Sequence, residues 1–226
     1  MNSRIKNIGF KRILSYVIGM TVLAMGLTLN TKLSLGVSPL LSTAFSTSEI
    51  YGFTLANASL VMYVLLVFAE ILLHIKMKSF VSIPIDAAQI PITVLFTRVM
   101  AVFDIFIPNY ATGSADSFFY SLTGRYILLI IAIVLIGIGA AMTMNARLVP
   151  NPGDGIVLVI SDFLKKEVGD VKNVFDISCV GITLLICVLS GSTIVGIGVG
   201  SVLGMLLTGR VIAVYNWMFV KRKVEA

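Results

Sequence analysis

Residues 125–146 read RYILLIIAIVLIGIGAAMTMNA, and no charged side chain occurs between Arg125 and Arg147. At about 1.5 Å per residue, an apolar helix of this length covers the roughly 30 Å of hydrocarbon in a bilayer. Hydrophobic residues make up 58% of the chain and charged residues only 12%, about half the charged fraction of a typical soluble domain. The stretch therefore predicts a helix that crosses a membrane.

Five other apolar stretches are long enough to do the same. With the first they lie near residues 13–30, 55–75, 83–106, 125–146, 173–190 and 193–219. Two shorter stretches, 39–50 and 155–166, follow a Ser-Pro pair and a Pro-Gly-Asp-Gly run, and they are too short to cross. We therefore expect an all-α integral membrane protein with six spans and two short re-entrant or interfacial helices.

Similar short sequence motifs recur in the same order in the two halves of the chain. Residues 97–104 read TRVMAVFD and residues 209–216 read GRVIAVYN, while 30–33 read NTKL and 145–148 read NARL. We interpret this as a duplication. Because each half holds three spans, an odd number, the two repeats are expected to be inverted relative to each other, as in many transporters.

The distribution of basic residues predicts an orientation and a division of the chain. Lys and Arg gather beside alternate ends of the spans, which favours both termini on the cytoplasmic side. The net charge of +6 comes without any nucleic-acid-binding pattern, so the expected partner is the lipid bilayer and not nucleic acid. The predicted segments are a basic N-terminus 1–12, a first repeat 13–106, an external connector 107–124, a second repeat 125–219 and a basic tail 220–226.

Three motifs carry a family resemblance. They are LGVSP at residues 35–39, QIPI at residues 89–92 and VKNVFDIS at residues 171–178. In their order and context the chain resembles the YczE/YyaS/YitT-type bacterial membrane proteins over roughly residues 12–218. The resemblance implies a multi-pass protein of the bacterial cytoplasmic membrane, and it implies no particular substrate or reaction.

Charged residues inside the predicted spans are the first candidates for function, because a buried charge in hydrocarbon is costly. Arg98 and Arg210 occupy equivalent positions in the two repeats, in the outer and the inner half of the membrane respectively. Both are candidates to bind an anionic group of a solute, and the alternative for Arg98 is that it extends to the outer membrane surface. Glu70 and Asp176 are expected at the depth of Arg210, where a structural salt bridge or a proton-coupling carboxylate would both fit.

The starts of the two short helices form the second candidate group. Ser38 and Asp154 are predicted to cap them, and a helix that begins inside a membrane directs free N–H groups at a ligand. The alternative is that both helices lie in the headgroup region. Asp86 and Gln89, on successive turns of the third span, are predicted to line a polar path or to make interhelical hydrogen bonds.

The remaining motifs are structural or absent. Gly196, Gly200 and Gly204 are spaced by four residues and predict a helix-packing face, within the monomer or in a homodimer. No phosphate-binding loop, catalytic motif or metal-ligand spacing occurs, so no cofactor, metal or enzymatic activity is expected. The sequence favours a secondary transporter or permease for a small solute, anionic or amphipathic; the alternative is a non-transporting accessory protein that binds a membrane partner.

Overall fold

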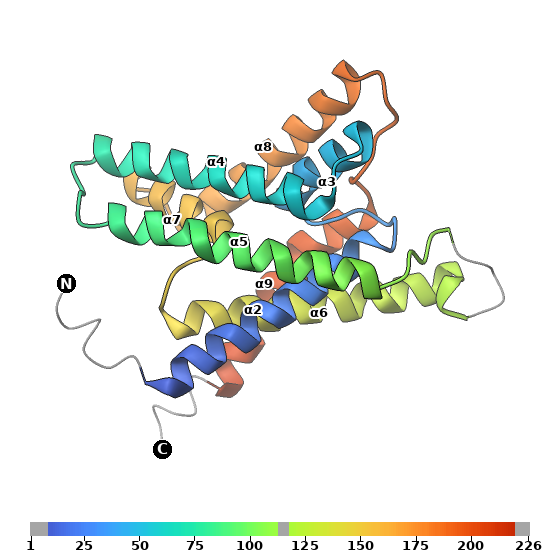
Figure 1. The fold of residues 1–226 in the computed structure, drawn as a ribbon, viewed down its shortest axis with the longest axis horizontal. Coiled ribbons are helices and arrows are strands. Elements are labelled where there is room, and N and C mark those ends of the chain that lie inside the picture. The colour runs from blue at the N-terminus through green and yellow to red at the C-terminus, as the bar shows by residue number, and fades with distance from the viewer. Residues whose placement is uncertain (1–8, 113–117, 220–226) are drawn as a thin grey trace.

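The computed structural model describes residues 9–112 and 118–219, and all the regular structure in that part of the chain is helical. Figure 1 shows the arrangement. The elements in order are α2 (Phe10–Thr31), α3 (Pro39–Tyr51), α4 (Leu55–Lys76), α5 (Ile83–Phe106), the 3-10 turn η1 (Phe118–Tyr120), α6 (Leu122–Ala146), α7 (Pro152–Leu164), α8 (Val168–Leu189) and α9 (Val199–Phe219).

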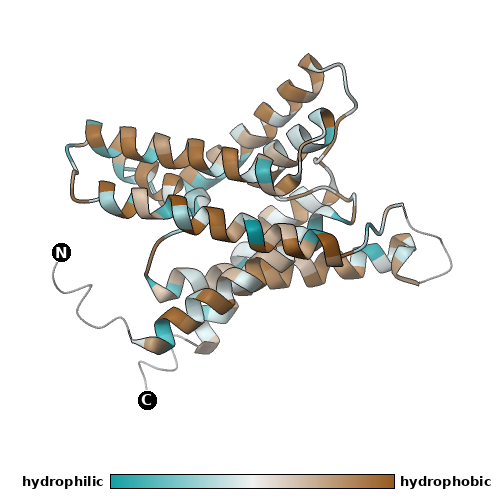
Figure 2. Cartoon of the chain, in the orientation of Figure 1, coloured by the Kyte–Doolittle hydropathy of each residue, from teal (hydrophilic) through white to brown (hydrophobic). Residues whose placement is uncertain are grey.

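Six of these helices, α2, α4, α5, α6, α8 and α9, are long and apolar enough to cross a membrane. Figure 2 shows hydrophobic colouring over most of their length. On α4 the apolar side chains of Val61, Leu65, Phe68 and Leu72 recur every three or four residues and are each more than half exposed. An exposed apolar stripe of this kind suits contact with lipid. The all-helical, six-span architecture predicted from the sequence is confirmed.

Several predicted boundaries shift by a few residues. The first helix begins at Phe10, three residues before the predicted start, and the fourth at Leu122. The second short helix begins at Pro152, not at residue 155, because proline at the first helical position needs no N–H partner. The sixth long helix begins at Val199, six residues later than predicted. Within the predicted connector, residues 113–117 lie outside the part that the structure describes, as do 1–8 and 220–226.

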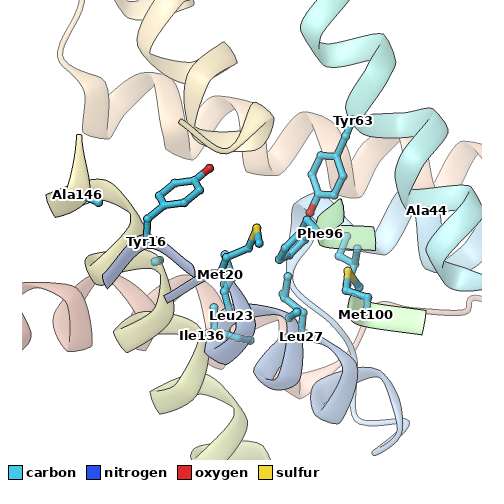
Figure 3. Close-up of a cluster of buried hydrophobic side chains, with 13 residues drawn as sticks. Tyr16, Met20, Leu23, Leu27, Ala44, Tyr63, Phe96, Met100, Ile136 and Ala146 are labelled. Carbon is cyan, nitrogen blue, oxygen red and sulfur yellow. The ribbon is translucent and has the colours of Figure 1, made fainter. Parts of the chain in front are cut away.

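The centre of the bundle is the pair α2 and α6, which pack along each other. Small residues allow the close approach: a Cβ on Gly26 would lie 2.8 Å from the backbone nitrogen of Ile136. Around this pair a buried cluster joins α2, α4 and α5, and Figure 3 shows Tyr16, Met20 and Leu23 beside Tyr63 and Phe96. The cluster fixes the α4–α5 hairpin against the central pair.

The two short helices pack on the opposite half of the chain: α3 lies on α8, and α7 lies on α4. For orientation, we call the side at which α2 begins and α4 ends the N-terminal side, and the opposite side the far side (Figure 1). α7 runs along α4 toward the N-terminal side, because Gly155 contacts Glu70 and Phe163 lies under Lys76.

α3 runs the other way. It starts where Ser42 bonds Thr183 in the middle of α8, and it ends where the Tyr51 hydroxyl bonds Ser190 at the far-side end of that helix. The starts of the two short helices meet, since the side chain of Leu40 occupies the space in which a Cβ on Gly153 would lie. α3 and α7 therefore begin together inside the bundle and run to opposite sides of it.

Within the monomer, the three glycines predicted on the sixth span do not form one helix-packing face, and the homodimer alternative stays a prediction. Gly196 precedes α9 and has a φ of +83°, and a Cβ on Gly204 would meet no atom within 4 Å. Gly196 and Gly200 lie instead where the segment before α9 crosses the segment before α3. The N–H of Gly200 donates to the carbonyl of Leu35 at 2.6 Å, and the N–H of Val37 donates to the carbonyl of Gly196 at 2.9 Å. The start of α9 is delayed because residues 196–198 lie in this crossing.

Candidate functional site

A column of polar and aromatic residues follows the contact between α4 and α5. Three pairs face each other in antiparallel order: Tyr63 with Phe96, Glu70 with Gln89, and His74 with Asp86. Their spacing of three, four or seven residues along each helix puts them on one face, which turns toward α7 and α2. This seam is the polar interior of the first half of the chain.

Glu70 and Gln89 form the buried centre of the seam. Glu70 is 1% exposed and Gln89 is fully buried. The Gln89 Nε2 group donates to Glu70 Oε2 at 2.6 Å. Glu70 Oε1 and Gln89 Oε1 are buried without a hydrogen-bond partner in the part of the chain that the structure describes, and so are the hydroxyls of Ser59 and Thr93. Such orphaned acceptors are uncommon in native interiors, and they point to a missing donor.

The salt bridges predicted for the buried acids take a different form. Glu70 bonds an amide, and Asp176 pairs with Lys172 at 2.6 Å one turn earlier on α8. Asp86, expected near the start of its span, is 4% exposed and accepts a 2.6 Å hydrogen bond from His74 or shares a proton with it. No ion pair between these acids and Arg210 occurs among the residues that the structure describes.

The start of α7 closes the seam from the side. Its cap is Asn151, whose side chain accepts from the N–H of Gly153 at 3.1 Å; the predicted cap Asp154 lies in the first turn instead. The correction follows from the earlier helix start. Burial raises the pKa of Asp154, and the nearby charges of Lys172 and Asp176 act in opposite directions on it. Gly155 lets α7 approach, since a Cβ there would lie 2.7 Å from Glu70 Oε1.

A small pocket lies beside this junction. It has a volume of about 20 Å³, and its lining includes Tyr16, Thr93, Phe96, Asn151 and Pro152. That volume holds about one water molecule. This pocket is therefore too small for any larger solute.

The start of α3 is also polar, through side chains other than the predicted cap. Ser38 occupies the N-cap position without a side-chain hydrogen bond. The hydroxyls of Ser42 and Thr43 both bond that of Thr183 on α8, at 2.8 and 3.1 Å. Hydroxyl groups from both halves thus meet where α3 begins.

The two arginines do not enter the interior. Arg98 is exposed, and its Nη2 donates to Asn57 Oδ1 at 3.0 Å across the α4–α5 surface. Arg210 is exposed near the middle of α9. The structure does not bring them together with Ser38, Asp154 or Gln89. Of the charged groups in the described part of the chain, those beside the junction are Glu70, Asp86 and Asp154, with the Lys172–Asp176 pair nearby.

The sequence groups Glu70 with Asp176, Asp154 with Ser38, and Asp86 with Gln89. The structure brings Glu70, Asp86, Gln89 and Asp154 into one cluster. The role of His74 was missed, because its partner Asp86 lies twelve residues away on the next helix. The unpartnered hydroxyl of Thr93 was also missed. The recurrence of polar residues at 86, 89 and 93, one turn apart, is the signal that could have identified a common face.

A family model described as a family of unknown function (DUF6198) matches residues 10–217. Neither the curated proteins nor the solved structures contain a match to the chain. The resemblance to the YczE/YyaS/YitT-type proteins stays a prediction.

Proposed function

The chain belongs to the family of unknown function DUF6198, and we propose that it is a secondary transporter or permease for a small solute in the bacterial cytoplasmic membrane. In this proposal the N-terminal side faces the cytoplasm and both termini lie there. The basic residues beside that side support the orientation; they include Lys76, Lys78, Arg147, Lys165 and Lys166. The proposal includes no enzymatic step.

The observation that carries the proposal is the meeting of the starts of α3 and α7 inside the bundle, at Leu40 and Gly153. Each short helix then returns to the side of the bundle from which its connection came, which favours the re-entrant over the interfacial interpretation. Two half-helices that begin near the membrane midplane and point their N–H groups inward are typical of transporter sites built at a repeat interface.

Equivalent contacts in the two halves support the inverted repeat. At the end of the first repeat Lys32 pairs with Asp104 at 2.7 Å. At the end of the second, Asn145 donates to Asn216 at 2.6 Å, and Asn216 is the residue that aligns with Asp104. The exchange of α3 and α7 between halves is reciprocal in the same sense.

The surroundings of the junction narrow the class of solute. Acidic side chains line it, while Arg98 and Arg210 lie on the outside of the bundle. A neutral or cationic solute with hydrogen-bonding groups therefore fits this interior better than the anion suggested by the arginines alone. Since the pocket holds about one water, transport requires an opening motion to one side at a time.

The test is solute uptake into proteoliposomes, with Thr93→Val as the site variant. This change removes an unpartnered buried hydroxyl at constant volume, so it should not reduce stability. A lost hydrogen bond of about 1 kcal/mol should weaken apparent solute affinity about fivefold. Thr21→Val is the control, because the Thr21 hydroxyl is exposed and bonds the Val17 carbonyl of its own helix.

The wild-type protein should accelerate uptake of at least one solute in a screen of neutral and cationic metabolite classes. If it accelerates none, the transport proposal fails. If uptake occurs but Thr93→Val and Thr21→Val behave alike, the protein transports and the junction is not its binding site.

A second candidate function is that of an accessory membrane protein bound to a partner chain or to a second copy of itself. The observation that favours it is α9, the least buried of the six long helices, which exposes Arg210 near its middle. An arginine facing lipid at that depth costs about 3 kcal/mol on insertion scales. Purification in mild detergent tests it: a stoichiometric partner lost on Arg210→Leu supports this role, and a monomer in both cases contradicts it.

A further inference from the structure

The Glu70–Gln89 pair lacks one hydrogen-bond donor. Gln89 Nε2 donates to Glu70 Oε2 at 2.6 Å, while the second oxygen of each side chain has no partner within the described part of the chain. Both residues are at least 99% buried. Two unpartnered acceptors on two groups that already touch cannot satisfy each other unless a donor is added between them.

We propose that Glu70 is a proton-binding site in which the carboxylic acid and the Gln89 amide form a paired, two-hydrogen-bond unit. One proton on Glu70 Oε1, donated to Gln89 Oε1, would partner both orphaned atoms at once. The inference rests on the proposed function only in one respect, which is that this proton would be the coupling ion of transport.

The charges around Glu70 favour the neutral acid. Asp86 on α5 faces Glu70, and the first turn of α7 brings Asp154 near the same seam. On α4 itself, His74 lies one turn from Glu70 and Tyr63 two turns from it. On α8 the nearest charges, Lys172 and Asp176, are paired with each other. No cation other than a protonated His74 faces the carboxyl among the described residues, and an ionised carboxylate buried among acids is costly.

The contact with α7 supports the same state. Gly155 places its backbone against both Glu70 oxygens, at a distance where a Cβ would be 2.7 and 2.8 Å away. This contact brings no hydrogen bond, since neither oxygen accepts one from α7. A neutral carboxyl tolerates such a surface far better than a carboxylate does.

His74 and Asp86 provide an entry route for the proton. Their side chains are 12% and 5% exposed, they are joined at 2.6 Å, and they lie one turn nearer the N-terminal side than Glu70 and Gln89. An imidazole can accept a proton at one ring nitrogen and release one from the other, which suits it to passing a proton. In the proposed step a proton from water binds His74, passes through Asp86 and ends on Glu70 Oε1, which leaves His74 neutral again.

Infrared difference spectroscopy on the full-length protein tests the proton directly. Asp154→Asn identifies any separate band of Asp154. The remaining band of the protein at neutral pH should be the carbonyl stretch of a buried, hydrogen-bonded carboxylic acid. Glu70→Gln should remove this band, and it should fold, because the amide resembles the neutral acid in size and can bond Gln89. Glu49→Gln, the same change at an exposed position on α3, is the matched control and should keep the band.

Two further variants separate the parts of the proposal. Gln89→Leu should shift the band to that of an acid without a partner, and His74→Asn should keep the band but slow its change after a pH jump. The proton site is refuted if the wild type lacks the band, if Glu70→Gln retains it, or if Na⁺ stabilises the protein through Glu70 while the carboxyl stays ionised.

Failure of the proton site and failure of the transport function give different results. If the band behaves as expected but no solute is taken up, the proton site stands and the proposed function fails. If uptake occurs and is driven by an imposed pH gradient, Glu70→Gln should lose that drive, while Glu49→Gln should keep it. Uptake that responds to the gradient equally in both variants would refute Glu70 as the coupling group.

Discussion

At the scale of single residues, Gly155 and Glu70 depend on each other. A Cβ on Gly155 would lie 2.7 and 2.8 Å from the two Glu70 oxygens, closer than real Cβ contacts come. Gly155→Ala should therefore lower the free energy of unfolding by about 1 to 3 kcal/mol, the usual cost of overpacking. Denaturant unfolding in detergent, followed by circular dichroism, measures the change.

A double-mutant cycle identifies the cause of that loss. Combined with Glu70→Ala, the Gly155→Ala change should cost little, because the space taken by the carboxyl is then free. Gly181→Ala is the control: it lies in α8, where a Cβ would meet nothing within 4 Å, and alanine is the better helix former there. Equal losses from Gly155→Ala with and without Glu70 would contradict the contact.

Asp154 should make stability depend on pH. Burial raises its pKa above the ordinary value of about 3.9, so the folded protein keeps this proton at pH values where the unfolded chain has released it. The free energy of unfolding then falls as pH rises from the ordinary value through the raised one. Asp154→Asn removes this effect, so its melting temperature relative to wild type should increase as pH rises above the ordinary value.

The comparison needs a variant without a shifted group. Glu49→Gln, at an exposed carboxyl, should keep a constant difference from wild type over the same range. If the difference between Asp154→Asn and wild type is also constant, the surroundings of Asp154 do not favour its neutral form.

The sequence was sufficient to mark the charged residues of the interior but not their partners. Glu70, Asp86 and Gln89 stand out because polar side chains within apolar helices are costly. Their pairing depends on the antiparallel register of α4 and α5, which the loop of residues 77–82 sets and which spacing along one helix does not reveal. Arg98 shows the converse: its position inside a span suggested a buried charge, but the rotation of α5 places it on the surface beside Asn57.

At the scale of elements, the connection before α3 crosses the connection before α9 at glycines. Gly36 has a φ of +98° and contacts the backbone of Gly198, while a Cβ on Gly198 would lie 2.9 Å from the carbonyl carbon of Leu35. Gly36→Ala adds a left-handed backbone penalty to a backbone clash, so we expect a loss of about 2 kcal/mol or more. Gly204→Ala on α9 has open space and should be neutral; thermal unfolding of both variants in detergent compares them.

Helix boundaries were predicted well where apolar runs end in polar or proline residues. They were predicted poorly where a glycine-containing segment sets the start of the helix. The start of α3 at Pro39 was predicted correctly, since a Ser-Pro pair is a strong start signal. The start of α9 was predicted six residues early, because the segment 193–198 is as apolar as a helix. Its non-helical backbone is set by a tertiary contact with residues 35–37, which hydropathy along the chain does not report.

At the scale of the whole molecule, the two halves make reciprocal contacts near the centre of the bundle, but their outer helix pairs are packed differently. α3 on α8 and α7 on α4 are reciprocal, and α2 with α6 forms the centre between them. The α4–α5 pair is closely packed, whereas α8 and α9 diverge after the crossing (Figure 1). Among the described residues the buried seam lies between α4 and α5 of the first half, so the more open second half is the part that can move without breaking it. In the transport proposal, opening would therefore come from α8 and α9.

The opposite courses of α3 and α7 give the last prediction. With Cys179 and Cys187 replaced by serine, a single cysteine in place of Tyr51 and another in place of Leu164 mark the ends of the two short helices. Both native side chains are more than half exposed. In right-side-out vesicles a membrane-impermeant thiol reagent should label Tyr51→Cys and not Leu164→Cys, and in inverted vesicles the pattern should reverse. A cysteine in place of Leu40, where the helices meet, should be protected in both. Labelling of Tyr51→Cys and Leu164→Cys from the same side would contradict the inverted, re-entrant arrangement, because two helices that start together and end on one side cannot belong to repeats of opposite orientation.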